Sequence, residues 1–596
     1  MSEPLILFAT ESGNAQEAAD YLSRQLKRIS LPCRSQNVES YSPDELIHET
    51  VVIFLVSTTG SGVEPRAMTP LWNMLLRSDL PADLFDELHF AVFGLGDSSY
   101  ERFCWAAKKL SRRLGGLGAI EICERGEGDD QHMLGTDGAL FPWTESLLCV
   151  LAGLYDVEPP VESETQYTLP SPRATLSLAT AVGPSPVSQA KASLSRDSTY
   201  HNATMKTNAR MTADDWYQDV RRFEFTFDED IEYQPGDVAV LHPLQLADEV
   251  ESFLTSMGWG NIADEPYSIT HVDKTQSMPS HVPAQTTLRE LFTRYLSFTA
   301  VPRRAFFLYL RHFTTDSIER DKLDEFLSST PEGAEDLYDY VYKVRRTIFE
   351  ILGEFHGARE GLRDRLDYLF DIFPPIRPRE FSIASCAGET GRTRQLELCV
   401  AIVKYRTRLR QPRRGLCTAY MADMKPGDQV MIGLKKGFIK LPDKKDTPII
   451  CIGPGTGVAP MRSLILQRIS EGIYNNTLYF GCRSTKKDHH FQSEWESLAK
   501  EDKLTYRVAC SRDGPEGVKR TYVQDLIEQD KARIWELIEA QGAWVYISGS
   551  SNKMPTAVKA SLALCAQECG GMVETEAKEY IRTMEREGRL TEECWS

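Results

Sequence analysis

Positive charge, metal-type cysteine spacings and long apolar runs are scarce in this sequence. Its 596 residues include 68 Lys and Arg against 86 Asp and Glu, a formal net charge of −18. This acidic balance argues against nucleic acid as a partner, because a phosphate backbone repels it. No apolar run reaches the roughly 20 residues that span a bilayer, and the stretch from Met1 to Ala9 lacks a signal-peptide pattern. The sequence therefore predicts no membrane anchor.

Cysteine occurs thirteen times, but never in the spacing of a metal site. There is no CxxC pair, and no histidine lies at zinc spacing from a cysteine. The closest pair, Cys565 and Cys569, fits helix packing better. We therefore expect no metal. An odd number of dispersed thiols favours a reducing compartment, the cytoplasm.

A chain of this length needs several hydrophobic cores. In residues 1–152, apolar runs at Leu5 to Ala9, Val51 to Val56 and Phe90 to Gly94 are typical of buried parallel strands. Helical patterns lie between these runs. The alternation predicts a doubly wound α/β domain.

The composition changes after Tyr155, where Pro, Ser, Thr and Ala become frequent, so residues 153–200 are expected to form a flexible linker. Residues 201–446 are expected to form antiparallel strands, and a charged helical insert interrupts them at about 247–373. The βαβ alternation resumes over residues 447–596. The predicted fold class is a multidomain α/β protein with an antiparallel β-barrel domain between two α/β domains.

Three loops follow strands of the first domain. Hydroxyls and N–H groups at a helix start form a phosphate cradle, and the first loop has no Lys or Arg, so dipoles and hydroxyls would hold the phosphate. Alone, such a turn is often only a helix cap. All three loops would meet at the carboxyl edge of one parallel sheet, where glycines allow close approach to a flat ring and an aromatic side chain can stack on it. The loop residues are Thr10, Glu11, Ser12, Gly13, Asn14 and Ala15, then Thr58, Thr59, Gly60 and Ser61, and then Gly94, Leu95, Gly96, Asp97, Ser98, Ser99 and Tyr100.

These segments resemble a flavodoxin-type FMN domain, and Leu95 to Tyr100 with Gly128 to His132 resembles the NADPH-dependent diflavin oxidoreductase family. Related reductases often have an aromatic residue where this chain has Thr59, so stacking on the flavin would fall to Tyr100. The resemblance also implies FMN contacts from Glu101, Arg102, Phe103, Cys104 and Asp130.

A second flavin motif runs from Arg379 to Ser382. Arg379 and Phe381 would share one face of a strand, so the cation can pair with a diphosphate while the ring packs on a flavin. The alternative is an ordinary amphipathic strand. The Gly-x-x-Thr pattern from Gly415 to Thr418 weighs against it, because it is typical of a helix start that can bind the second part of the diphosphate. The pattern resembles the FAD domain of ferredoxin-reductase-like flavoproteins, which usually have Tyr in place of Phe381. The expected FAD residues are Arg345, Arg379, Glu380, Phe381, Ser382, Gly415, Leu416, Cys417, Thr418 and Trp595.

A glycine-rich turn, Gly453 to Pro460, follows the strand at Ile449 and opens a helix. It lacks the lysine of an NTPase loop, so ATP is not expected. Ser511, Arg512 and Arg520 suit a ribose that carries a phosphate, which favours NADPH over NADH, although surface arginines are the ordinary alternative. The resemblance assigns NADPH to Thr456, Ser511, Arg512, Arg520, Thr521, Tyr522, Val523 and Gln524.

The resemblance also implies an electron relay from NADPH through FAD to FMN and on to a protein acceptor. Ser382, Glu593 and Trp595 are the expected catalytic residues, with Trp595 as a lid over the FAD ring. Relatives have Cys where this chain has Ser548, and commonly Asp where it has Glu593.

The acceptor is not written in the sequence. The missing anchor argues against a microsomal reductase for haem monooxygenases. The lack of an oxygenase domain before these residues argues against a fusion of the nitric-oxide-synthase type. The short form resembles the branch that reduces the iron–sulfur protein anamorsin in cytosolic iron–sulfur cluster assembly, and some relatives are also mitochondrial. A soluble reductase for a haem protein and a non-catalytic flavodoxin-like scaffold are the alternatives. Residues 1–150 contain 22 acidic and 12 basic residues, a net charge of −10 that could steer a basic partner or simply confer solubility.

Overall fold

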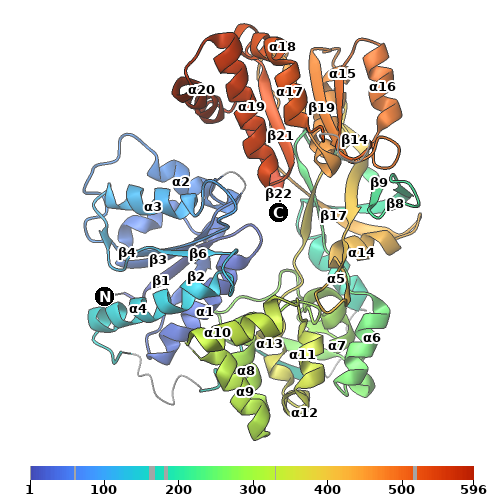
Figure 1. Ribbon diagram of the computed structural model, residues 1–596. Helices are drawn as coiled ribbons and strands as arrows, with labels where there is room; N and C mark the ends of the chain where they lie inside the picture. The colour runs from blue at the N-terminus through green and yellow to red at the C-terminus, as the bar shows by residue number, and fades with distance from the viewer. Residues whose placement is uncertain are drawn as a thin grey trace. The chain divides into compact units, whose positions relative to one another are not determined.

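The computed structural model describes residues 2–59, 62–159, 168–179, 186–328, 330–514 and 520–595. The chain divides into two compact units. Unit 1 comprises residues 1–193, 245–377 and 406–411, and unit 2 comprises residues 194–244, 378–405 and 412–596. Each unit is described by itself (Figure 1).

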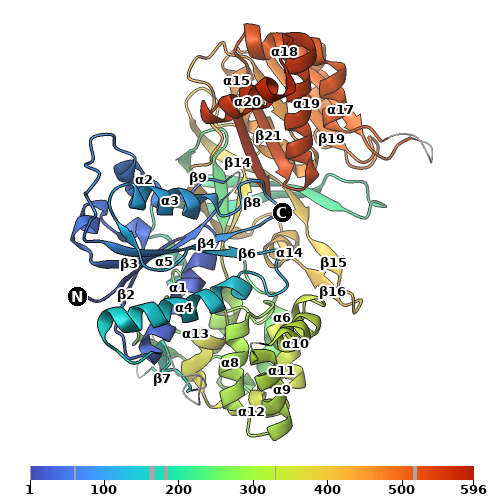
Figure 2. The same ribbon diagram turned by 60° about the vertical axis from the view of Figure 1, so that its left-hand side comes forward.

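Unit 1 begins with a parallel sheet of strand order β2-β1-β3-β4-β5, with β6 paired to β4. Helices α1 and α4 cover one face, and α2 and α3 cover the other (Figures 1 and 2). The central strands are buried from end to end, which is why their sequences read as unbroken apolar runs. The elements are β1 (Leu5–Ala9), α1 (Asn14–Arg28), β2 (Arg34–Asn37), β3 (Val51–Ser57), α2 (Thr69–Leu75), β4 (His89–Gly96), α3 (Trp105–Gly115), β5 (Ile120–Glu121), β6 (Gly126–Asp129) and α4 (Asp137–Tyr155).

Helix α4 has the length and apolar composition of a helix that could cross a membrane. The absence of a membrane anchor stays a prediction. In this structure, however, Leu147, Leu148 and Leu151 of α4 are buried against the sheet. One helix of this kind is weak evidence for a membrane span, because core helices have the same composition.

The segment predicted as a linker contains regular structure. Strand β7 (Ala174–Leu178) pairs with β11 (Tyr267–His271), which also pairs with β12 (Gln285–Thr286), and helix α5 spans Pro186–Leu194. Arg173 next to β7 donates hydrogen bonds to Asp371 and Asp20 at 2.9 and 3.0 Å, so this part of the segment is fixed to unit 1.

The helical insert forms the rest of unit 1. Its core is aromatic: Phe253 stacks on Phe298 at 4.4 Å between ring centroids and meets Phe292 and Phe373 edge-on. The helices are α6 (Ala247–Ser256), α7 (Leu288–Glu290), α8 (Arg304–Phe313), α9 (Ser317–Leu327), α10 (Pro331–Leu337), α11 (Ile348–Glu354), α12 (His356–Arg363) and α13 (Leu369–Ile372).

Unit 2 begins with an antiparallel sheet of strand order β13-β10-β17-β8-β9-β14. A bridge from Ile383 to Leu398 links the two edges of the sheet and curls it toward the predicted barrel. The elements are β8 (Tyr200–Arg210), β9 (Asp219–Glu232), β10 (Val238–Leu241), β13 (Arg379–Ser382), β14 (Arg392–Ile402), the short pair β15 (Lys404–Arg406) and β16 (Pro412–Arg414), α14 (Leu416–Asp423) and β17 (Gln429–Lys435).

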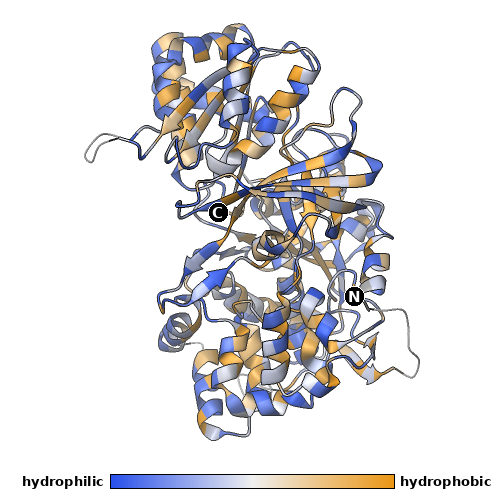
Figure 3. Ribbon diagram, turned by 90° about the vertical axis from the view of Figure 1, so that its right-hand side faces the viewer, coloured by the Kyte–Doolittle hydropathy of each residue, from blue (hydrophilic) through white to orange (hydrophobic). Residues whose placement is uncertain are grey.

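The remainder of unit 2 is a parallel sheet of order β20-β19-β18-β21-β22 between helices, which confirms the predicted βαβ fold class. Hydrophobic segments run through this sheet (Figure 3), and its central strand β18 is hydrophobic along its whole length. The elements are β18 (Ile449–Ile452), α15 (Val458–Ser470), β19 (Asn476–Cys482), α16 (Gln492–Lys500), β20 (Thr505–Cys510), α17 (Val523–Gln529), α18 (Lys531–Trp535), β21 (Trp544–Ser550), α19 (Lys553–Gly570), α20 (Glu574–Arg586) and β22 (Leu590–Trp595).

Two glycines of the insert test how closely its helices pack. A Cβ atom at Gly361 in α12 would lie 1.8 Å from the carbonyl oxygen of Phe313, whereas one at Gly353 in α11 meets nothing within 4 Å. Gly361→Ala should therefore destabilise the insert by about 1–3 kcal/mol, because α8 and α12 must separate. Gly353→Ala is the matched control and should be neutral or stabilise by about 0.5–1 kcal/mol. Thermal unfolding, with hydrogen exchange of α8, measures both; equal effects would contradict this packing.

Candidate functional site

The first loop of unit 1 leaves the start of α1 open. Gly13 adopts a left-handed φ of 90° as the N-cap, and no described side chain caps the helix. The Thr10 hydroxyl accepts a hydrogen bond from the Gly13 N–H at 2.8 Å and so fixes the loop. Ala15, in the first turn of α1, is buried, and Ser12 is exposed. The uncapped N–H groups at this helix start fit a bound phosphate.

The second loop is tied to the first. Glu11 accepts a hydrogen bond from the backbone N–H of Arg66 at 2.6 Å, and Thr59 donates from its hydroxyl to the Val63 carbonyl at 3.3 Å. The Thr58 hydroxyl is buried and has no partner among the described residues, which leaves it available to a ligand. Gly60 and Ser61 lie outside the described residues.

The third loop is organised by Asp129, which was not among the predicted contacts. Its carboxylate accepts hydrogen bonds from the backbone N–H groups of Ser98 at 2.9 Å and Gln131 at 3.0 Å. Burial raises the pKa of Asp129, but these hydrogen bonds outweigh it and hold the pKa below its ordinary value. The only sequence signal for Asp129 was its place in the run from Gly128 to His132 that carries the family resemblance.

Most of the other predicted residues of this loop lie at or near its surface. Asp97 accepts a hydrogen bond from the Ser99 N–H at 2.8 Å, and the Asp130 N–H donates to the Gly96 carbonyl at 2.9 Å. The exposed residues are Ser98, Ser99, Glu101 and Asp130, and the partly exposed ones are Asp97, Tyr100, Arg102 and Phe103.

Gly94 and Gly96 serve packing as well as any ligand. A Cβ atom at Gly94 would lie 2.7 Å from that of Ala107, and one at Gly96 would lie 2.9 Å from the Cys104 nitrogen. Cys104 and Leu95 are buried, and burial raises the pKa of the Cys104 thiol to about 12. The sequence predicts that these glycines allow the approach of a flat ring; in the structure they make room for the start and first turn of α3.

In unit 2, strand β13 carries the second flavin motif. It pairs with β10 in the register Phe381 to Ala239 and Arg379 to Leu241, which puts Arg379 and Phe381 on one face as predicted. Phe381 is partly buried against the sheet core, and Arg379 is exposed. Glu380 on the other face pairs with Lys435 at 3.2 Å, and Ser382 is half-buried.

Helix α14 brings the downstream FAD residues to this motif. The Arg379 guanidinium lies near enough to Cys417 to oppose the effect of burial, which raises the pKa of that thiol to about 12. The Thr418 hydroxyl accepts a hydrogen bond from the Val403 N–H at 3.1 Å, so it joins β14 to α14. No described side chain caps α14 at Gly415, and Leu416 is its first residue.

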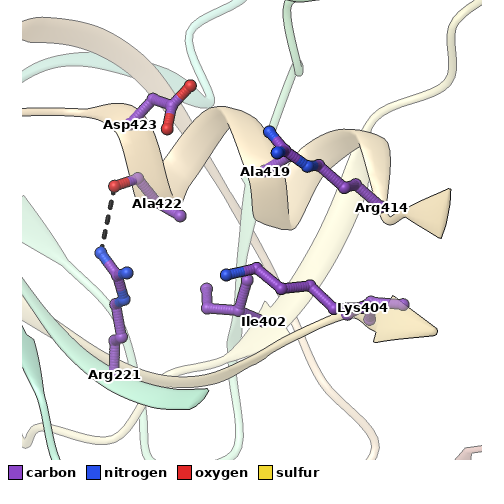
Figure 4. Close-up of a pocket in the computed structure, with 8 residues that line it drawn as sticks. Arg221, Ile402, Lys404, Arg414, Ala419, Ala422 and Asp423 are labelled. Carbon is purple, nitrogen blue, oxygen red and sulfur yellow. Dashed lines mark hydrogen bonds between the residues drawn. The ribbon is translucent and has the colours of Figure 1, made fainter. Parts of the chain in front are cut away.

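A cavity lies along α14, lined by three cations, by Asp423 and by two alanines of the helix (Figure 4). Arg221, Lys404 and Arg414 line it, and Arg221 donates to the Ala422 carbonyl at 3.1 Å. This bond places Arg221 at the carboxyl end of α14, whereas Arg414 in β16 directly precedes the helix start at Gly415. Of the remaining predicted FAD contacts, Arg345 lies in the insert of unit 1, in a turn with a left-handed φ of 54°.

The nicotinamide loop joins β18 to α15 through a 3₁₀ turn, Gly455–Gly457. A Cβ atom at Gly457 would lie 2.1 Å from the carbonyl oxygen of Ser548, so only glycine lets the loop cross the end of β21. Thr456 is half-buried in this turn.

The residues predicted for the NADPH phosphate lie after β20. The Ser511 hydroxyl donates to the Cys482 carbonyl at 3.3 Å, and Arg512 is exposed. Arg483 and Arg512 both lie over the ring of Tyr217, at 5.4 and 5.9 Å from its centroid, which makes Arg483 a further candidate cation. Arg520 and Tyr522 are exposed, Thr521 and Gln524 are half-buried, and Val523 is buried in the core.

The end of the chain is held in a strand. Trp595 pairs with Ser550, and its carbonyl accepts a hydrogen bond from the Ser551 N–H at 2.8 Å, while its side chain is 41% exposed. Ser548 pairs with Glu593 across β21 and β22, so both side chains share a face. The Ser548 hydroxyl is buried without a partner among the described residues. The lid role of Trp595 stays a prediction.

Arg462 of α15 joins the nicotinamide sheet to the flavin sheet. This residue is buried, donates to the Ala384 carbonyl at 2.6 Å, and pairs with Glu494 at 2.6 Å and Glu397 at 3.1 Å. The neighbouring Ser463 donates to the Ser385 carbonyl at 2.6 Å. The helix that begins at the nicotinamide loop therefore fixes the residues that follow Ser382.

These sites define a reductase with two flavins and a nicotinamide cofactor. The chain matches the family models described as flavodoxin over residues 6–143, FAD binding domain over residues 196–420 and oxidoreductase NAD-binding domain over residues 451–560. It is 38% identical to NADPH-dependent diflavin oxidoreductase 1 of Cryptococcus neoformans over 99% of this chain and 100% of that one. Identity is 37% to the Xenopus laevis protein and 34% to the Schizosaccharomyces pombe protein of the same name, over 99% of both chains in each case.

This chain belongs to the NADPH-dependent diflavin oxidoreductase family. It is an enzyme, and its cofactors are FMN, FAD and NADPH. The individual contact residues stay predictions.

The low pKa of Asp129 leads to a prediction about acid. Because folding lowers this pKa, Asp129 stabilises the folded loop above its ordinary value of 3.8, and that contribution is lost as the pH falls through the folded value. FMN release, followed by flavin fluorescence, should rise over this range. Asp129→Asn should release FMN more readily already at pH 7, whereas the exposed control Asp86→Asn should match the parent. An unchanged FMN affinity in Asp129→Asn would refute the role.

Removing the buried Arg462 tests the junction in unit 2. Arg462→Met leaves Glu494 and the Ala384 carbonyl without their cation, while Glu397 keeps its pair with Arg222 at 2.8 Å, and should destabilise unit 2 by about 3 kcal/mol. Arg392→Met breaks the exposed pair of Arg392 with Glu232 at 2.6 Å and should cost less than about 1 kcal/mol. Calorimetric unfolding compares the two variants; similar losses would show that burial at Arg462 does not matter.

Proposed function

We propose that this enzyme delivers its electrons to a protein acceptor, an iron–sulfur protein of the anamorsin type in cytosolic iron–sulfur cluster assembly. The observation that carries the proposal is the charge of the domain that holds the FMN loops. Residues 1–150 contain 22 acidic and 12 basic residues. Such a domain attracts a partner with a basic docking surface. The proposal also draws on the sequence resemblance to the soluble branch of the family.

Two acidic side chains stand at the loops from which electrons would leave. Glu101 and Asp130 are exposed on and beside the third loop, at the carboxyl edge of the sheet. Asp83 and Asp86, which precede β4, are exposed toward the opposite edge. The two pairs carry the same charge but lie at different distances from the FMN loops. Comparing variants of the two pairs therefore distinguishes docking at the loops from a general effect of the domain's charge.

The division of labour between cofactors and residues supports electron transfer to a protein. When bound, the flavins take up two electrons together from NADPH and release them one at a time. The chain supplies positions: the start of α1 for a phosphate, Arg379 and the start of α14 for a diphosphate, and Arg462 to fix the nicotinamide loop against β13.

We further propose that the enzyme works in the cytoplasm, with a mitochondrial pool as in some relatives. All thirteen cysteines are free thiols, several of them buried, which suits a reducing compartment.

The test is stopped-flow mixing of NADPH-reduced enzyme with a purified anamorsin-type protein. Cluster reduction should be second order and slow as salt rises, because screening weakens the attraction. Glu101→Gln with Asp130→Asn should lower the rate about threefold or more at low salt, and Asp83→Asn with Asp86→Asn should not. FMN content, measured in each variant, separates lost flavin from lost docking.

Each outcome decides between acceptors. A cluster that stays oxidised while ferricyanide is reduced would refute the iron–sulfur acceptor and leave the enzyme class intact. Faster reduction of a basic haem protein such as cytochrome c, with the same dependence on Glu101 and Asp130, would favour the haem-protein alternative.

A further inference from the structure

Helix α1 packs on the helical insert through a stripe of charged residues. Glu17, Asp20, Arg24 and Lys27 recur three or four residues apart and so lie along one face of the helix. Lys27 pairs with Asp273 at 2.5 Å, and Arg24 donates to the Gln276 side chain at 2.5 Å. By sequence alone this stripe is an ordinary solvated face. In unit 1 it is an interface.

At its amino end the same interface reaches the FMN phosphate loop. Arg377 donates to the Gly13 carbonyl at 3.1 Å and to Glu17 at 2.9 Å. Arg303 donates to the Asn14 side chain at 3.0 Å and pairs with Glu17 at 3.0 Å. A Cβ atom at Gly13 would lie 1.8 Å from the Arg377 guanidinium carbon, so the guanidinium lies directly against the loop.

The loop needs cations that it does not itself contain. Residues 10–15 include no Lys or Arg but include Glu11, and Glu17 follows in the first turns of α1. Arg66, on the second loop, is engaged by Glu11 at 3.5 Å. A phosphate dianion at this helix start would face both carboxylates. Arg303 and Arg377 contact the loop from outside the flavodoxin fold, 289 and 364 residues away in sequence.

We infer that Arg303 of the insert and Arg377, just after it, complete the FMN phosphate site, so that FMN is held by the flavodoxin domain together with these residues of unit 1. The arginines compensate Glu17 and supply the positive charge that the loop lacks. They are positioning and affinity residues for the cofactor, and they take no part in electron transfer itself. This role goes beyond the proposed acceptor and does not depend on it.

A consequence follows from the reciprocity of coupled binding. If docking of α1 on the insert strengthens FMN binding, then FMN binding strengthens docking by the same factor. Protection of the segment 273–277 from hydrogen exchange should therefore decrease when FMN is removed and return when FMN is added.

The test compares FMN with riboflavin, which has the same ring and no phosphate. Full-length protein stripped of FMN, with FAD retained, is titrated with each flavin and followed by flavin fluorescence. Arg377→Gln should weaken FMN binding about tenfold, and Arg303→Gln should act in the same direction. Neither substitution should change riboflavin affinity or FAD content, because both losses concern the phosphate alone.

Two further variants separate charge from docking. Lys27→Met removes one ion pair at the far end of α1, where the contacts of Asp20 and Arg24 still hold the helix on the insert, so FMN affinity should stay within twofold of the parent. Glu17→Gln removes a carboxylate that opposes the phosphate, so it should tighten FMN binding. If the pair of Glu17 with the arginines were purely structural, Glu17→Gln would instead weaken FMN binding, because breaking the pair from either side would loosen the loop.

Any one of three results would overturn the inference. They are an FMN affinity unchanged in Arg377→Gln, an equal loss for FMN and riboflavin, and weaker FMN binding in Glu17→Gln. If Arg377→Gln does not fold, Arg377→Lys gives the same test. It retains the charge and should keep FMN binding within about threefold of the parent, and a tenfold loss specific to FMN would show that charge is not what the site needs.

Discussion

The buried guanidinium of Arg462 is the interaction on which the arrangement of unit 2 depends. A cation inside a protein is tolerated only when its hydrogen-bonding capacity is met, and here two carboxylates and a carbonyl meet it. Those partners come from the flavin sheet, from α16 and from the residues after Ser382. One side chain thus sets the nicotinamide loop, which opens the helix of Arg462, in a fixed position relative to the flavin motif.

In unit 1, helix α1 makes contacts through two of its faces. The apolar face of α1 packs on the parallel sheet, and its charged face meets the insert. Asp20 is almost fully buried between Arg173 and Ser277, so this contact is more than a surface salt bridge. The insert belongs to the FAD-binding stretch of the sequence, yet it packs with the flavodoxin domain because α1 offers it charge complementarity.

Features that depend on a few consecutive residues were predictable from the sequence. Features that depend on contacts between residues far apart in the sequence were not. The apolar runs placed β1, β3, β4, β18 and β21 because buried parallel strands must be continuously hydrophobic. The loops after these strands were predicted because their glycines and hydroxyls are local. Asp129 was missed as the anchor of the third loop, since its partners at Ser98 and Gln131 follow from folding. Gly96 was assigned to a ligand, whereas the space it leaves is filled by Cys104.

The sequence by itself determined the family, the three cofactor classes and the order of the domains, because these rest on motifs of a few consecutive residues. Only the tertiary structure decided which charges act together. Arg303 and Arg377 are unremarkable in the sequence, and a charged stripe on α1 looks like a solvated face. They become part of one electrostatic site because folding brings them within hydrogen-bonding distance of Gly13, Asn14 and Glu17, and Coulombic attraction depends on separation in space.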